Sequence, residues 1–198
     1  VIKESGDGIW ARIVSPYSSK SIGFYFYPEV GDEVILGFLG NDPRYAIIVG
    51  SVYSKKNPPP NTPENKNELK SIVTKSKMKI DFQEKDKIIS METPGGQKIT
   101  LDDKAKAVKI EDQNKNLISM TDKGITMQSG KDIVLKAKGK ITVSSVGNTT
   151  VSSKADVSLA GNNVKSKAKI ALKAEGAASA ELKASGKVVI KGSMVNIN

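Results

Sequence analysis

The sequence contains neither cysteine nor histidine. Without cysteine the chain can form no disulfide bond and offers no thiol nucleophile or thiolate ligand for zinc. Without histidine it lacks the imidazole of hydrolase triads and the commonest side-chain ligand of transition metals. We therefore expect a protein that is not an enzyme, with no catalytic residue, no metal site and no cofactor.

Aromatic residues are also scarce, at 5% of 198 residues, and nine of the ten lie within the first 53 positions. Net positive charge is also unevenly distributed, but it is concentrated at the C-terminal end of the chain. Residues 1–57 carry six basic and six acidic side chains, whereas residues 131–198 carry twelve lysines and only four acidic side chains within a total net charge of +10. Two different kinds of structure are therefore joined in one chain.

The aromatic-rich region, residues 1–57, contains four short β-prone runs with turn residues between them. The runs are 9–14, 23–27, 33–38 and 46–53. Short strands at this spacing predict a small all-β barrel. Its size fits an OB-fold barrel, although strand propensity alone does not separate that fold from an SH3-like barrel.

An OB-fold barrel can bind single-stranded nucleic acid by stacking bases on aromatic rings such as Trp10, Tyr25 and Tyr27. A net charge of zero over residues 1–57 does not suit a groove that must follow phosphates. We favour the interpretation that these rings fill the barrel and its contacts, and we expect no specific nucleic-acid partner.

Residues 58–71 are predicted to be a linker. Four prolines fall within residues 58–63. Proline lacks the amide hydrogen needed in a sheet and favours an extended, partly rigid chain. This segment is therefore the clearest domain boundary.

From residue 72 to residue 198 the chain alternates apolar and polar residues. Between Ile125 and Asn163 the odd positions are uncharged except for Lys131, and between Val164 and Met194 the even positions are uncharged. A period of two predicts β-structure with one dry face and one wet face. The change of phase at Asn162 and Asn163 predicts an odd insertion, as a bulge or an altered turn, and a second change precedes Val195.

A longer period of eight residues runs through the same region, which indicates a repeat of one five-residue strand and one three-residue turn. Eight residues are too few for a full coil of a single-chain β-helix. Three chains wound together would each supply one side of a prism, so we predict an intertwined homotrimer. Its core is predicted to contain Ile125, Met127, Ile133, Leu135, Ile141, Val143, Val151, Val157, Leu159, Ile170, Leu172, Leu182, Val188 and Ile190.

The lysines of this region fall mainly on the wet face. We favour a role in solvating the outside of the prism and blocking edge-to-edge pairing. An alternative from another functional class is a binding module, an OB-fold barrel with a basic β-repeat tail that grips nucleic acid or anionic polysaccharide.

Several segments together resemble the VgrG family, which includes the spike proteins of contractile phage baseplates and of extracellular injection systems. The resemblance is carried by residues 10–13, 23–34, 40–44 and 48–53 and by the lysine-rich repeats up to residue 198. The residues that mark the motif are Pro28, Gly31, Asp32, Glu33, Gly50, Asn57 and Pro58.

The resemblance implies an all-β fold, with an OB-fold barrel followed by a trimeric triple-stranded β-helix at residues 72–198. It further implies a central spike that pierces the target envelope, with a hub and tube at its N-terminal end and a PAAR-type tip protein at its C-terminal end. The tip interface would be formed by Val195, Asn196, Ile197 and Asn198. An effector is a further implied partner, and contact with the target membrane would be transient.

The opening residues lack the pattern of a secretory signal peptide. We therefore expect assembly in the bacterial cytoplasm, or on a phage-like particle, followed by delivery outward. The absence of an initiator methionine and of a hub region suggests a fragment of a longer spike.

Overall fold

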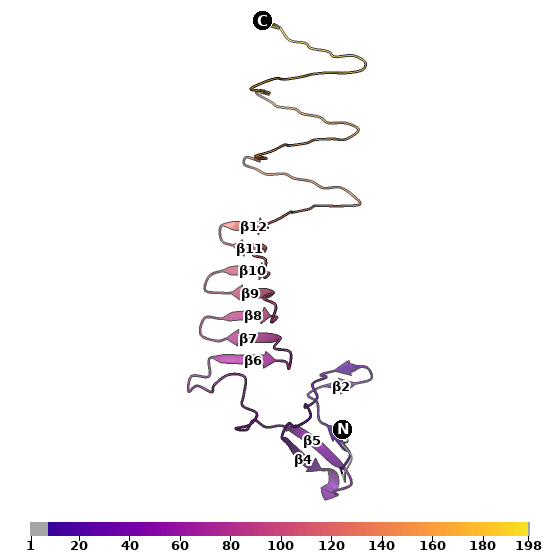
Figure 1. Ribbon diagram of the computed structural model, residues 1–198, viewed down its shortest axis with the longest axis vertical. Coiled ribbons are helices and arrows are strands. Elements are labelled where there is room, and N and C mark those ends of the chain that lie inside the picture. The colour runs from indigo at the N-terminus through magenta and orange to yellow at the C-terminus, as the bar shows by residue number, and fades with distance from the viewer. Residues whose placement is uncertain (1–7, 198) are drawn as a thin grey trace. The chain divides into compact units, whose positions relative to one another are not determined.

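The structure is a computed structural model that describes residues 8–197. The chain divides into two compact units, the first ending at Lys136 and the second beginning at Ala137. Within the described residues every regular element is a strand, apart from a single 3-10 turn at Leu39–Asn41 (Figure 1). The expectation of an all-β protein is therefore confirmed.

The N-terminal domain contains a three-stranded sheet in the order β1-β5-β4. Its strands are β1 (Ala11–Ile13), β4 (Val34–Phe38) and β5 (Ala46–Ser51), with β1 parallel and β4 antiparallel to β5. Ile35 pairs with Gly50 and Leu36 with Ile48, so Val49 is left without a partner on β4. Such a bulge increases the local twist of the two strands.

A small hairpin of β2 (Ser18–Ser19) and β3 (Ile22–Gly23) follows β1. The prediction of a strand over residues 23–27 is wrong, because β3 ends at Gly23 and residues 24–27 belong to no strand. The reason is the absence of a neighbouring strand. Beyond Gly23 the backbone of this segment keeps the hydrogen bond from Phe24 N to the oxygen of Tyr17, at 2.9 Å, and then runs on extended.

The middle of the chain is a seven-stranded antiparallel sheet in which each strand pairs with the next along the sequence (Figure 1). Each strand has five residues: β6 (Leu69–Val73), β7 (Lys79–Gln83), β8 (Ile88–Glu92), β9 (Lys98–Asp102), β10 (Ala107–Glu111), β11 (Leu117–Thr121) and β12 (Gly124–Gln128). Because β6 begins at Leu69, this sheet starts inside the segment predicted to be linker. The division of the chain into three domains otherwise stays a prediction.

Alternate turns of this sheet share one geometry at a spacing of nineteen residues, beginning at Thr74, Thr93 and Asp112. In each, the first residue's amide donates to the carbonyl of the residue four positions on, at 2.9 to 3.2 Å. Its side-chain oxygen accepts the amide of that same later residue. The fourth residue of each turn has a positive φ, namely Lys77, Gly96 and Lys115. The three turns are therefore repeats of one unit.

The start of the sheet is tied to the proline-rich segment by polar contacts. Asn61 Nδ2 donates to Ser71 Oγ at 2.7 Å, and Ser71 Oγ donates to Asp81 at 2.5 Å. Asp81 also pairs with Lys79 at 2.7 Å and is only 6% exposed. These contacts restrain residue 61 relative to β6 and β7.

From residue 129 to residue 197 no strand is present, although the chain runs as extended segments between bends (Figure 1). The bends recur every eight residues, at positions 130, 138, 146 and 154 and again at 161, 169, 177 and 185. Only the interval from 154 to 161 has seven residues. The predicted change of phase is thus present, but the expected insertion is wrong: one residue is missing rather than added.

Assignment of a strand requires a hydrogen-bonded neighbour. In this segment the side-chain contacts are local, such as Ser145 Oγ with the oxygen of Gly147, and every residue from 137 to 197 is exposed. The sequence pattern of strands is present, and the partners that would complete them are not supplied by the same chain.

Candidate assembly interface

The seven-stranded sheet has one face that is almost entirely apolar. Cross-strand pairing aligns its residues in two rows, and the only polar member of either row is Lys70. One row contains Lys70, Phe82, Ile89, Leu101, Val108, Met120 and Ile125. The other contains Ile72, Ile80, Met91, Ile99, Ile110, Ile118 and Met127. We call these two rows the apolar face.

The opposite face is mostly polar. Its central row contains Ser71, Asp81, Ser90, Thr100, Lys109, Ser119 and Thr126. Asp81 of this row forms an ion pair with Lys79 of a neighbouring row. An outer row alternates in charge, so that Lys79 opposes Glu92, Glu92 opposes Lys98, and Lys98 opposes Glu111. Opposite charges directly across a strand pair are favourable, so this row is matched in charge within the chain.

A groove of about 660 Å³ follows one row of the apolar face. It is lined along its length by Ile72, Ile80, Ile99, Ile110 and Ile118, and it extends to Ile133 beyond the last strand. Phe26 of the N-terminal domain also lines it. An open apolar groove of this length on a single-layer sheet indicates a surface that another protein surface covers.

The single chain has almost no interior. Among the described residues only Ala46 and Ala107 are buried apolar residues, and no side chain is exposed by less than 2%. The accessible surface is 18950 Å², whereas a globular protein of this mass exposes about 9,000 Å². The excess indicates that stability comes from contacts between chains.

Of the predicted core residues only two, Ile125 and Met127, lie in a strand, and this chain alone buries none of the predicted residues. Ile125 and Met127 belong to the apolar face, while Val151 is 76% exposed and Ile170 is 99% exposed. Their role in a shared core stays a prediction. The same holds for the tip interface, since Val195, Asn196 and Ile197 are exposed. Asn198 lies outside the described residues.

The motif residues of the N-terminal domain are brought together around one turn. The amide of Glu29 donates to Asp32 Oδ2 at 2.8 Å, and the side-chain amide of Asn57 donates to the oxygen of Gly31, which has a φ of 96°. Val52 N donates to the oxygen of Glu33 at 3.0 Å. Pro28 adjoins the same turn, whereas Gly50 lies in β5 and Pro58 follows Asn57. These residues shape the backbone.

Sequence reasoning missed the apolar positions between Ile72 and Met120, because it applied the eight-residue period to the whole of residues 72–198. The signal that would have found them is the nineteen-residue spacing. Ile80, Ile99 and Ile118 occupy equivalent positions in it. Each repeat consists of a turn, a strand, a second turn and a second strand, and the first turn contains a residue with positive φ.

Six ion pairs join charged side chains within the described residues, and five of them are exposed. Hydrogen bonding to Arg44 lowers the pKa of Asp42, and hydrogen bonding to Lys104 lowers the pKa of Asp86. Within residues 8–197 no group of acidic side chains is placed to hold a metal ion. No helix among these residues is long and apolar enough to cross a bilayer.

Comparison with known protein families accounts for both parts of the chain. Residues 1–53 match the type VI secretion system/phage-baseplate injector OB domain, and residues 88–165 match the phage baseplate V C-terminal trimerisation domain. The chain joins an injector OB domain to a baseplate trimerisation domain. In these two segments the chain is therefore similar to trimerising components of phage-baseplate and type VI contractile injection machines. Both matched domains are structural and non-enzymatic.

Similarity to individual spike proteins is more distant. The chain is 41% identical over 58 residues to the actin cross-linking toxin VgrG1 of Vibrio cholerae, which is 29% of this chain and 5% of that protein. It is 38% identical over 58 residues to the type VI spike protein VgrG5 of Pseudomonas aeruginosa, and 36% identical over 70 residues to VgrG1a of the same species, covering 29% and 35% of this chain. The matched part spans only 7% and 10% of those two relatives.

Proposed function

We propose that the chain is the shaft of a homotrimeric central spike of a contractile injection machine, which mechanically pierces the target envelope. The observation that carries this proposal is the uncovered apolar face of β6 to β12, which continues in sequence pattern into the exposed residues 129–197. Three copies related by a threefold axis would bury this face in a common core. The two matched domains support the same assembly.

The finer architecture that we propose for residues 129–197 is an intertwined triple-stranded β-helix. Bends at eight-residue intervals divide this segment into extended runs, and each run alternates apolar and polar residues. In the proposed trimer each run would hydrogen-bond to runs of the other two copies above and below. Unpaired backbone groups would then be satisfied, as folded proteins require.

Rigidity follows from such an arrangement, because every strand edge would be paired and the lysines would face solvent. We further propose a PAAR-type tip protein on residues 195–198, a hub and tube at the N-terminal end, and an effector as cargo. Assembly would occur in the bacterial cytoplasm or on a phage-like particle. Transient contact with the target membrane would follow contraction.

The proposal is tested by placing one charge on each face of the same strand. Ile99→Asp puts a carboxylate on the apolar face, whereas Thr100→Asp puts it on the polar face one residue along. We expect light scattering to give the mass of a trimer for the wild type and for Thr100→Asp, and a lower mass for Ile99→Asp, because an unpaired buried charge is very costly.

A wild-type monomer would overturn the proposal, as would a trimer that tolerates Ile99→Asp. The alternative of a basic binding module predicts tight, salt-dependent binding to oligonucleotides or anionic polysaccharide. Binding titrations at low and moderate salt on the same preparation separate the two functions, and the spike predicts no such specific binding.

A further inference from the structure

The aromatic segment, which we define as residues 24–27, belongs to no strand of the N-terminal domain. Its sequence is Phe-Tyr-Phe-Tyr. The exposed fractions of its four side chains are 58%, 83%, 64% and 56% in sequence order. A run of aromatic residues with strand propensity is normally half-buried on a sheet, so this exposure calls for a covering surface.

The segment has two distinct sides. The rings of Tyr25 and Tyr27 lie together, with centroids 4.8 Å apart and planes tilted by 58°. Phe26, between them in the sequence, lines the apolar groove together with Ile72, Met78 and other residues of the sheet. Phe26 therefore lines the groove, whereas Tyr25 and Tyr27 do not.

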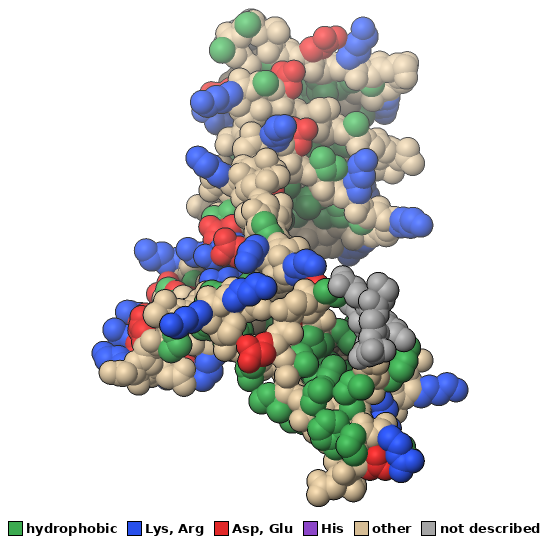
Figure 2. Space-filling model, turned by 60° about the horizontal axis from the view of Figure 1, so that its bottom comes forward, with side chains coloured by type: hydrophobic (Ala, Val, Ile, Leu, Met, Phe, Trp, Pro, Cys, Tyr) green, Lys and Arg blue, Asp and Glu red, His purple; other side chains and the backbone are tan. Residues whose placement is uncertain are grey.

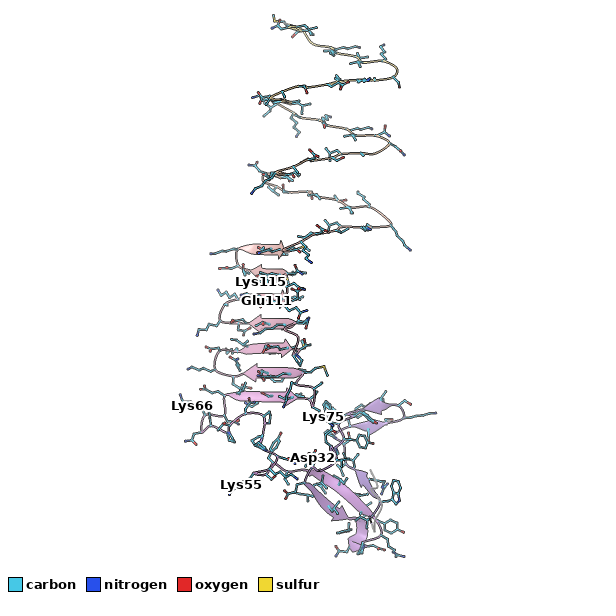
Figure 3. The ribbon with its side chains drawn as sticks, viewed as in Figure 1. Asp32, Lys55, Lys66, Lys75, Glu111 and Lys115 are labelled. Atoms are coloured by element: carbon cyan, nitrogen blue, oxygen red, sulfur yellow. The ribbon has the colours of Figure 1, made fainter. Side chains whose placement is uncertain are left out.

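An ion pair holds the end of the segment to the sheet. Lys75 Nζ lies 2.7 Å from Glu29 Oε2, and Lys75 belongs to the turn between β6 and β7. The hydrogen bond to Glu29 raises the pKa of Lys75, and the charge of Asp32 raises it further. Lys75 and Asp32 are labelled in Figure 3. This ion pair links the chain two residues after the aromatic segment to a turn of the sheet.

We propose that the aromatic segment of each copy is covered by a second copy of the chain, so that the interface between copies extends from the trimerisation domain into the injector OB domain. The occupant follows from continuity, because Phe26 lines the same groove as Ile99, Ile110 and Ile118, which lie within the matched trimerisation domain. A copy that covers those isoleucines also covers Phe26. This inference rests on the proposed trimer.

The surface in view is consistent with such a contact. Figure 2 shows hydrophobic side chains gathered in one patch on the N-terminal domain, while charged side chains are spread over the remainder of the same view. Charged residues are depleted at the centres of interfaces between subunits, and aromatic residues are enriched there. Tyr45, 57% exposed but absent from the groove, provides a matched reference position.

The experiment uses the absence of native cysteine. Phe26→Cys and Tyr45→Cys are made separately in the full chain, and their rates of maleimide labelling are compared in the trimer. We expect labelling at position 26 to be slower by about tenfold or more, because burial limits access to the thiol. Both positions should label rapidly once denaturant has dissociated the trimer.

Equal labelling rates in an intact trimer would overturn this inference and leave the proposed function standing. Slow labelling at position 26 that persists in a dissociated, folded monomer would also overturn it, since the chain's own residues would then cover the site. A wild-type monomer by light scattering removes the proposed function and this inference together.

A second measurement does not depend on cysteine. Phe26→Ser should dissociate to monomer at a lower guanidinium concentration than wild type, whereas Tyr45→Ser should match wild type within error. Identical midpoints for the two variants would contradict the inference, because a side chain at a subunit interface contributes to the stability of the oligomer.

Discussion

At the scale of single residues, the structure depends on a few polar side chains that fix turns and strand starts. Asp112 and Asp81 are the two clearest cases. Asp112 lies at the surface and organises a turn, whereas Asp81 is 6% exposed and organises the first two strands of the sheet. Their different surroundings predict different responses to substitution.

The carboxylate of Asp112 accepts the amides of Asn114 and Asn116 at 2.8 and 2.9 Å. These hydrogen bonds, led by the one from the Asn116 backbone, lower its pKa from 3.8. A lowered pKa means that this carboxylate stabilises the fold above its ordinary pKa and that the contribution is lost as pH falls through the folded value.

We therefore expect Asp112→Ala to lower the guanidinium midpoint at neutral pH, and the difference from wild type to shrink as the solution becomes more acidic than the pKa in the folded chain. Denaturation curves at several pH values check this expectation. Asp122→Ala, in the next turn, is the control. A difference that grows toward acid would contradict the expectation.

Asp81 joins Ser71, Lys79 and, through Ser71, Asn61. Asp81→Ala would leave the ammonium of Lys79 and the hydroxyl of Ser71 without their acceptor in a poorly hydrated place. We expect a loss of about 1–3 kcal/mol in the free energy of unfolding, measured by denaturant titration. Asp103→Ala, in an exposed turn, should change it little, and an equal effect of the two variants would rule out this role for Asp81.

At the scale of elements, the main features are two repeats of different length. Repeats of nineteen residues form β7 to β12, and these strands pair with one another within the chain. Runs of eight residues follow from residue 129, and these runs form no strand pairs within the chain. Around residues 154–161 one run is shortened to seven, and the apolar positions move from odd to even.

This shortening predicts an unequal tolerance of insertions. One glycine inserted after Ala160 would restore eight-residue spacing and keep apolar residues on the same side throughout, so the trimer should persist. One glycine inserted after Val146 would turn Lys154 and Asp156 toward the core and should prevent assembly. Size-exclusion chromatography with light scattering compares the two variants, and equal masses would contradict the prediction.

At the scale of the whole molecule, a single chain exposes most of the apolar side chains that a folded protein would normally bury. Its exposed area is about twice that of a globular protein of the same mass. The proposed trimer therefore predicts that stability depends on the concentration of chains, as it does in obligate oligomers. The segment with the fewest contacts inside the chain, residues 129–197, should depend on the assembly most.

Hydrogen exchange of the wild-type trimer tests this dependence. We expect the amides of residues 129–197 to be protected as strongly as those of β7 to β11, although only the latter have partners in their own chain. The proline-rich residues 58–68 provide a reference for rapid exchange. Rapid exchange of residues 129–197 in an intact trimer would contradict strand pairing between copies.

Three properties followed from the sequence alone. They are the all-β class, the change in composition near the prolines of residues 58–63, and the division of each alternating segment into an apolar and a polar face. These properties are local, since alternation decides which side chains share a face whatever the strand pairs with. The motif around Gly31 and Asp32 was also readable, because a tight turn with a positive φ restricts the residues that fit it.

The tertiary structure decided what the strands pair with. Residues 72–128 and 129–197 both alternate, but only residues 72–128 pair within the chain. There, turns beginning at Thr74, Thr93 and Asp112 alternate with turns at residues 84–87, 103–106 and 122–123, so that the chain reverses after every strand. It also placed Phe26 on the groove and left residues 24–27 out of any strand. Alternation shows which side chains share a face, but it does not show which strand lies alongside. Only the three-dimensional path of the chain shows which segments have a neighbouring strand in the same chain, and we propose that another copy supplies the neighbour for the rest.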